Sequence, residues 1–258
     1  MVEKVSVIDQ DLKSLLSLMG NISKKGFVPS VNYGSSSIGM TLLAELGINY
    51  SSTGKPNYRG IVVNASRNKF STKLNRVNLF AQVPDWTISN CKSSREIVET
   101  YGYVTKDGGK KLFCTINSKH NNSQNLRLRI DKSTEILHEE FHSSDIVVNV
   151  ASWYLNTLKS RLLKTHPITL WVQGNVLKKN GKEYFHYTTA TFTGPPNVDA
   201  FIDLLNLGTI SIDHLISKKE NSVSEKGPLF KILRGNFPLL FPIQMSFDLL
   251  NLGSFLRK

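Results

Sequence analysis

Two helix-like segments precede a long series of strand-like segments in this chain, and this order strongly restricts its fold. Residues 11–26 carry apolar side chains at helical spacing and end at a glycine, while residues 35–48 follow a serine-rich N-cap region and stop at Gly47. Period-two and β-branched runs then predict strands at residues 58–66, 77–83, 110–118, 125–131, 209–219 and 227–233, and hairpins at residues 134–152 and 168–194. Helices followed by such a series predict an α/β (α+β) domain with a mixed sheet.

Three more segments complete the expected order. Residues 153–167 have an amphipathic helical pattern that ends before a proline, residues 197–208 end at a glycine, and residues 246–258 predict a short helical tail. The run at residues 58–66 is expected to be a central strand. A length of 258 residues suits a single domain, 1–258, and we further expect two lobes, 1–140 and 141–258, around a cleft.

The charge balance favours a nucleic-acid partner. The chain has 32 Lys and Arg against 20 Asp and Glu, and its basic segment "SRNKFSTKLNR", residues 66–76, contains no acidic residue. Basic side chains that contact phosphates release counterions, so this surface favours nucleic acid. No apolar run is long enough for a membrane span, and charges occupy the place of a signal-peptide core, so we expect a cytoplasmic protein without a membrane partner. Cys91 and Cys114 are far apart in the sequence and are expected to be reduced.

The segment "GKPNYRGIVVNASR", residues 54–67, has the frame of a metal-dependent nuclease strand without its polar ligands. Metal-dependent DNA hydrolysis needs carboxylates that converge on Mg²⁺, often with a lysine near the attacking water. One economical layout places an Asp before a strand and Glu-x-Lys within it, because residues two apart share one face. The corresponding positions here are Asn57, Val62 and Asn64, which supply neither a carboxylate nor an ammonium group.

Several blocks of the sequence resemble those of the MvaI/BcnI family of restriction endonucleases, which is related to the mismatch-repair nuclease MutH and to the PD-(D/E)XK fold. "GSSSIGMTLLAELGI", residues 34–48, resembles the family's "GxTGIGxTLExLLGI", and residues 54–67 resemble its "GPDxKGIELKxxR". Other blocks follow in family order: "NRVNLFAQVPDW", "SSREIVETYGY", "KKLFCTINSK", "LKSRLLKTHPITLWV", "YFHYTTATFT", "GTISIDHLIS" and "GPLFKI". The resemblance covers most of residues 15–250 and implies a PD-(D/E)XK mixed sheet flanked by helices.

For catalysis, the resemblance implies a loss. The family's helix Glu corresponds to Leu43, its Asp to Asn57, its Glu to Val62 and its Lys to Asn64. Random drift would not be expected to remove all four polar positions and keep the surrounding scaffold. We therefore expect a catalytically inactive DNA-binding protein without a metal cofactor, which acts in a restriction or anti-phage system with a protein partner that supplies the chemistry.

Double-stranded DNA, or another nucleic-acid complex, is the expected partner of the basic segment that follows the degenerate strand. Five residues are expected to contact its backbone: Arg67, Lys69, Lys73, Arg76 and Lys119. The resemblance also places the family's base-reading arginines near Leu215 and Ser224. Sequence-specific recognition is therefore expected to have weakened together with catalysis.

Two other functions stay open on the sequence. One is an active Mg²⁺-dependent type II endonuclease with a relocated metal site, for which Asp85, Glu45 and Glu96 are the nearby carboxylates. The other is a protein-interaction scaffold that does not bind DNA. The string "HEEFH", residues 138–142, fits the zinc motif H-E-x-x-H, but we expect a β-hairpin there, and a strand does not present both histidines as a helix does.

Overall fold

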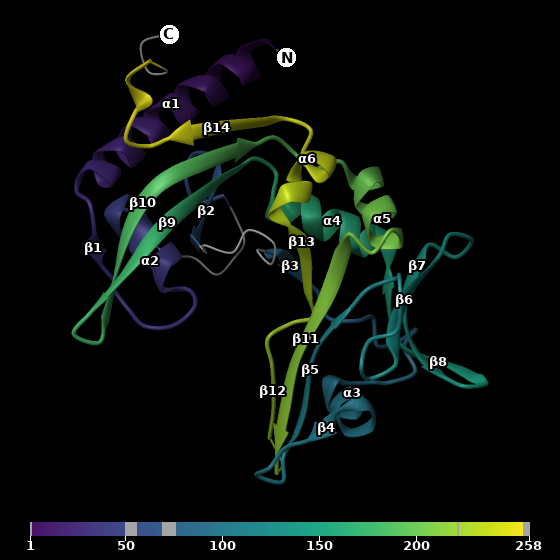
Figure 1. Cartoon of the computed structure of the whole chain (residues 1–258). Helices are drawn as coiled ribbons and strands as arrows, with labels where there is room; N and C mark the ends of the chain where they lie inside the picture. The colour runs from purple at the N-terminus through teal and green to yellow at the C-terminus, as the bar shows by residue number, and fades with distance from the viewer. Residues whose placement is uncertain (1, 50–55, 69–75, 221, 255–258) are drawn as a thin grey trace. The chain divides into compact units, whose positions relative to one another are not determined.

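The structure is a computed structural model that describes residues 2–49, 56–68, 76–220 and 222–254 (Figure 1). The chain forms two compact units, each assembled from stretches that are separated in the sequence. Unit 1 comprises residues 1–72, 164–195 and 241–258, and unit 2 comprises residues 73–163 and 196–240. The expected lobes, 1–140 and 141–258, differ from this division, since residue 140 falls inside strand β7 (Ile136–Ser143) of unit 2.

The sheet of unit 1 combines strands from both ends and the middle of the chain. Its members are β1 (Val28–Pro29), β2 (Val62–Arg67), β9 (Thr169–Lys179), β10 (Lys182–Thr193) and β14 (Gln244–Asp248). They follow the order β1–β10–β9–β2, with β14 also paired to β10. Because β2 runs parallel to β9 while the other pairs are antiparallel, the expected mixed sheet is confirmed. Among the described strands β2 lies at an edge of this sheet, so the expectation of a central strand was wrong.

Two helices pack on this sheet, and their buried side chains form a hydrophobic core with those of its strands. They are α1 (Val2–Lys24) and α2 (Ser37–Glu45), and Gly47 follows α2 in the left-handed conformation, with φ of 69°, that ends the helix. Leu15, Leu42, Val63 and Phe185 belong to one buried cluster that joins both helices to β2 and β10. Each such fully buried side chain stabilises the fold by about 1.5–3 kcal/mol.

The C-terminal segment is a strand where the sequence predicted a helix. Residues 244–248 form β14, and a short 3-10 helix, η3 (Leu252–Ser254), follows it. Phe247 is buried and lies opposite Ala190 of β10. Pairing with the free edge of β10 satisfies backbone groups that an isolated short helix would leave to solvent, which explains the difference.

Unit 2 contains two antiparallel sheets. The larger one has the order β3–β13–β11–β5–β4, with β12 paired to β11. Its strands are β3 (Arg76–Ala81), β4 (Tyr103–Val104), β5 (Lys110–Ile116), β11 (Ile210–Lys219), β12 (Ser222–Glu225) and β13 (Leu229–Leu233). The smaller sheet comprises β6 (Leu126–Asp131), β7 and β8 (Ile146–Tyr154). The predicted hairpin at residues 134–152 is therefore confirmed.

The helices of unit 2 are short. They are α3 (Ser94–Tyr101), α4 (Leu155–Thr165), α5 (Val198–Asn206) and α6 (Phe237–Leu240), with one 3-10 turn, η2 (Arg234–Asn236). Both α3 and α5 contact β11. In the part of the chain that the structure describes, no helix is long and apolar enough to cross a membrane.

Candidate functional site

The four positions that the sequence resemblance aligns with catalytic residues lie on neighbouring elements of unit 1. Leu43 is on α2, which contacts β2, and Asn57 lies just before β2, which carries Val62 and Asn64. Leu43 is only 7% exposed and packs in the same buried cluster as Val63. The helix position therefore contributes apolar packing, and its side chain has no atom that could bind a metal ion.

Asn57 has a structural use that a carboxylate would not fulfil. Its Oδ1 accepts a hydrogen bond of 2.7 Å from the backbone N–H of Val63, and its Nδ2 donates one of 3.3 Å to the carbonyl oxygen of the same residue. The side chain thus pairs with β2 as a short piece of strand would. Only an amide can both accept and donate here, because an ionised carboxylate has no proton to give.

Val62 and Asn64 share one face of β2, because side chains alternate along a strand. Val63, on the opposite face, enters the buried cluster, whereas Val62 and Asn64 stay partly exposed. Their positions opposite Thr169 and Trp171 of β9 keep the orientation that a metal-binding pair would need. The face itself presents an isopropyl group and a neutral amide, neither of which stabilises Mg²⁺ as a carboxylate does.

Five carboxylates of unit 1 are engaged by other groups. The pairs are Asp9 with Lys13, Asp11 with Arg59, Glu45 with Lys25, Glu183 with Arg67, and Asp248 with Asn251. Across residues 2–49, 56–68, 76–220 and 222–254, no three His, Cys, Asp or Glu side chains form a group that could hold a metal ion. The donor set of this site therefore does not fit the Mg²⁺ ion that the nuclease strand would need.

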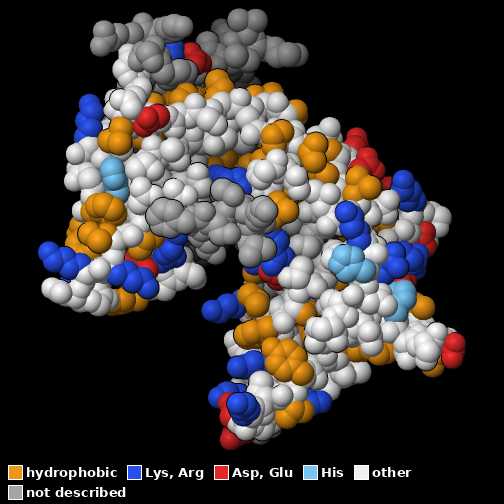
Figure 2. Space-filling view, viewed as in Figure 1, with side chains coloured by type: hydrophobic (Ala, Val, Ile, Leu, Met, Phe, Trp, Pro, Cys, Tyr) orange, Lys and Arg blue, Asp and Glu red, His pale blue; other side chains and the backbone are white. Residues whose placement is uncertain are grey.

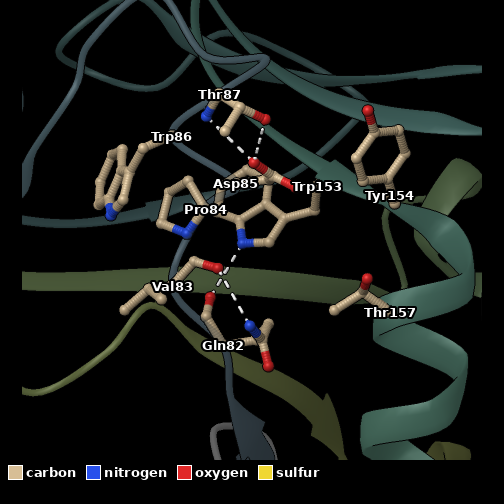
Figure 3. Close-up of a pocket in the computed structure, with 9 residues that line it drawn as sticks. All are labelled: Gln82, Val83, Pro84, Asp85, Trp86, Thr87, Trp153, Tyr154 and Thr157. Carbon is tan, nitrogen blue, oxygen red and sulfur yellow. Dashed lines mark hydrogen bonds between the residues drawn. The ribbon is translucent and has the colours of Figure 1, made fainter.

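Asp85, the main candidate for a relocated metal site, lines a cavity of unit 2 (Figure 3). Its Oδ1 accepts hydrogen bonds from the backbone N–H of Thr87 at 3.0 Å and from the Thr87 hydroxyl at 2.6 Å. The other residues around the cavity are Gln82, Val83, Pro84, Trp86, Thr87, Trp153, Tyr154 and Thr157. Asp85 is the only carboxylate in this lining, and it closes a local turn. Glu96 likewise caps the start of α3 by accepting from the backbone N–H of Lys92.

The histidines of the "HEEFH" string do not converge. They lie on strand β7, where His138 is bonded to the Ser152 hydroxyl and His142 lies 3.2 Å from Glu140. Glu139, between them, pairs instead with His214 of β11 at 2.8 Å. A strand spaces residues four apart by about 13 Å, too far for one zinc ion.

Arg67, the first of the residues expected to contact the DNA backbone, is hydrogen-bonded to other residues of unit 1. Its Nη1 donates to the carbonyl oxygen of Ser35, and its Nη2 donates to that of Gly34, to the Ser37 hydroxyl and to Glu183 Oε2, all at 2.7–2.9 Å. The hydrogen bond from Arg67 holds the pKa of Glu183 below its usual range. A guanidinium committed to four acceptors organises the protein first, and its direct phosphate contact stays a prediction.

The other expected contacts differ in their surroundings. Arg76 forms a bidentate pair with Asp213, at 2.6 and 3.0 Å, within unit 2. Lys119 is exposed and extends over Gly208. Lys69 and Lys73 lie outside the described residues. Leu215 pairs with Phe113 inside the larger sheet and Ser224 is exposed on β12, so neither position supplies a base-reading side chain of the family's kind.

A basic feature that the sequence analysis treated only as a turn is the end of the β9–β10 hairpin. Lys178, Lys179 and Lys182 are exposed there, beside the exposed ring of Tyr33. The segment "KKNGKE" places three lysines in a run of six residues, which could have indicated an anion-binding surface. Its Asn-Gly pair predicts a hairpin turn, and the segment was therefore given only that structural role.

Replacing Asn57 by aspartate is expected to destabilise the protein by about 1 kcal/mol, because the Val63 carbonyl loses its donor and faces a negative charge. Urea denaturation followed by circular dichroism measures the change. Asn64→Asp is the matched control, since it adds the same charge within β2 at a partly exposed side chain. Equal stability of the two variants would contradict the role of Asn57 in β2.

Comparisons with known proteins agree with the fold described above. The family model described as MvaI/BcnI restriction endonuclease family matches residues 16–241. The restriction endonuclease MvaI in complex with its cognate DNA has a similar structure, with a TM-score of 0.76, 20% identity, and coverage of 92% of this chain and 98% of that one. MvaI without DNA gives a TM-score of 0.55 at 19% identity, covering 92% and 97%. No curated protein sequence matches significantly.

Proposed function

This chain belongs to the MvaI/BcnI restriction endonuclease family, and from that premise we propose that it binds double-stranded DNA without cutting it. The degenerate metal site carries the proposal. Its scaffold of α2, β2 and the segment before β2 is intact, while Leu43 is buried, Asn57 is bonded to Val63 and Val62 has no ligand atom. A net charge of +12 supports retained DNA binding.

Two assays on one preparation test this function. Supercoiled plasmid incubated with the protein and Mg²⁺ or Mn²⁺ is expected to stay supercoiled, while fluorescence anisotropy with a labelled duplex is expected to show binding. If four phosphates are contacted, the affinity should fall about 100-fold between about 50 and 200 mM salt.

Each alternative has its own outcome in these assays. Cleavage that disappears in Asp85→Asn would establish a relocated metal site and overturn the proposal. Absence of binding at micromolar protein in low salt would favour a protein-interaction scaffold and would overturn it as well.

A DNA-binding subunit without a metal site needs a second protein if the complex is to cut. We therefore place this chain in a restriction or anti-phage system together with a catalytic partner. Affinity purification from native cells is expected to recover a protein with an intact nuclease motif. Recovery of the chain alone, across gentle lysis and crosslinking, would contradict this assembly.

A further inference from the structure

The end of the β9–β10 hairpin is a compact group of cations in unit 1. Strands β9 and β10 pair from Thr169 opposite Thr193 to Lys179 opposite Lys182, and the turn residues Asn180 and Gly181 have positive φ of 51° and 72°. Two positive φ values are typical of the tight turns that join long antiparallel strands. Residues 177–182 are all exposed, so the last residues of both strands extend beyond the buried core (Figure 1).

The positive charge of this end is only partly neutralised, by the Glu183 carboxylate. Lys179 and Lys182 lie directly opposite each other, an arrangement of like charges that destabilises a sheet. Lys178 lies opposite Glu183 and its charge acts on that carboxylate, which is hydrogen-bonded to Arg67 at 2.7 Å. Four cations, the three lysines and Arg67, therefore share one carboxylate, and the excess positive charge is available for an anionic partner. Blue side chains are visible at this end in Figure 2.

A loop with an exposed aromatic ring lies beside the hairpin. Tyr33 is 78% exposed, and with Arg67, Lys178 and Gly181 it lines a hollow of about 470 Å³. The loop is held to β10 by the bond from the Ser30 backbone N–H to the Glu183 carbonyl oxygen, at 2.9 Å. An aromatic ring kept in solvent next to several cations suits a partner that presents phosphates beside the apolar atoms of sugars and base edges.

Arg67 connects the two parts of this surface. It donates to the carbonyl oxygens of Gly34 and Ser35 in the loop and to the Glu183 carboxylate in the hairpin. Its guanidinium also lies 5.5 Å from the centre of the Phe185 ring. Arg67 is thus a positioning residue that fixes the Tyr33 loop relative to the lysines.

We propose that the Tyr33 loop and the β9–β10 end form a clamp on the backbone of duplex DNA, in which Lys178, Lys179 and Lys182 contact phosphates and Tyr33 packs against the groove edge. This inference rests on the proposed DNA-binding function and assigns it to a defined surface. The grouped cations favour a polyanion, and duplex DNA is the polyanion on which the proposed function rests.

The test compares two triple variants by fluorescence anisotropy with a labelled duplex over a salt series. Lys178→Ala/Lys179→Ala/Lys182→Ala is expected to reduce the slope of log affinity against log salt by about 2–3 and to weaken binding at least tenfold at about 100 mM salt. Lys106→Ala/Lys132→Ala/Lys226→Ala removes the same charge from exposed positions of unit 2 and is expected to keep the wild-type slope. Tyr33→Ala is expected to weaken binding with the slope unchanged, because Tyr33 carries no charge.

The outcomes separate the clamp from the function on which it rests. If the wild-type protein does not bind the duplex, the proposed function fails and the clamp fails with it. If the wild-type protein binds and the hairpin variant keeps its affinity and slope, the clamp alone is overturned. An equal loss in both triple variants would also overturn it, since only net charge would then matter. Circular dichroism confirms that every variant is folded.

Discussion

Replacing His214 by alanine is expected to reduce the free energy of unfolding of unit 2 by about 3–5 kcal/mol, because it leaves a buried carboxylate without its partner. His214 and Glu139 are both completely buried, and His214 Nε2 lies 2.8 Å from Glu139 Oε2. The second polar atom of each residue, His214 Nδ1 and Glu139 Oε1, has no hydrogen-bond partner among the described residues. Removing His214 therefore leaves both oxygens of the buried Glu139 carboxylate without a donor among those residues.

The same pair predicts how stability depends on pH. Burial acts to lower the pKa of His214, but the charge of Glu139 and its hydrogen bond, together with Glu225 and Asp213, outweigh it, and the pKa lies above its usual value of 6.5. A raised pKa in the folded state means that the stabilisation is complete below about pH 6.5 and is lost as the pH rises through the folded value. Wild-type protein should therefore be less stable at pH 9 than at pH 6.

Urea denaturation at both pH values, followed by circular dichroism, measures these effects. Glu135→Gln is the control, because Glu135 is exposed and lies just before β7, the strand that carries Glu139. This variant is expected to leave the pH dependence of stability unchanged. The double variant Glu139→Leu/His214→Leu should recover most of the stability and lose the pH dependence, since an apolar pair of similar volume removes both charges. A loss below about 1 kcal/mol in His214→Ala would show that the pair contributes little.

The local patterns of the sequence predicted most elements of the fold. The helix stop at Gly47, the helix that ends before Pro167 and the Asn180–Gly181 turn all depend on neighbouring residues, and the structure has each of them. Cys91 and Cys114 are free, as expected. Features that depend on distant segments were missed. The edge position of β2 follows from pairing with β9 about a hundred residues later, and no local period encodes such a partner.

The predictions for the candidate site also separate into those that depend on local sequence and those that depend on distant residues. The loss of catalytic groups at Leu43, Asn57, Val62 and Asn64 was predicted from the resemblance to the family's motifs, and it stays a prediction. The hydrogen-bond partners of these side chains were not visible in the sequence. Asn57 bonds to the backbone of Val63, six residues later, and Arg67 bonds to Glu183 in another part of the chain. The basic residues were predicted from their clustering and from their place after the degenerate strand, and two of them, Arg67 and Arg76, already have carboxylate partners in the fold.

Asp213→Asn is expected to destabilise unit 2 by about 2–3 kcal/mol, because this carboxylate is the centre of a partly buried charge network. It accepts from Arg76 at 2.6 and 3.0 Å, from Lys231 at 2.7 Å and from the Thr115 hydroxyl at 2.7 Å. Burial acts to raise the pKa of Asp213, but these bonds outweigh it and hold the pKa below its usual 3.8. A lowered pKa gives stability that is present above about pH 3.9 and is lost as the pH falls through the folded value.

The hydrogen bonds between Arg76 and Asp213 indicate whether Arg76 has a structural role or a DNA-binding role. If its guanidinium serves Asp213, then Arg76→Ala should lower the free energy of unfolding, as Asp213→Asn does, and should leave the salt dependence of DNA binding unchanged. If Arg76 contacts a phosphate through its exposed part, Arg76→Ala should lower the slope of log affinity against log salt by about 0.9. We expect the first result, because both terminal nitrogens of Arg76 already donate to Asp213, and one also donates to Ser211. Anisotropy and urea denaturation on the same two variants separate the structural role from the binding role.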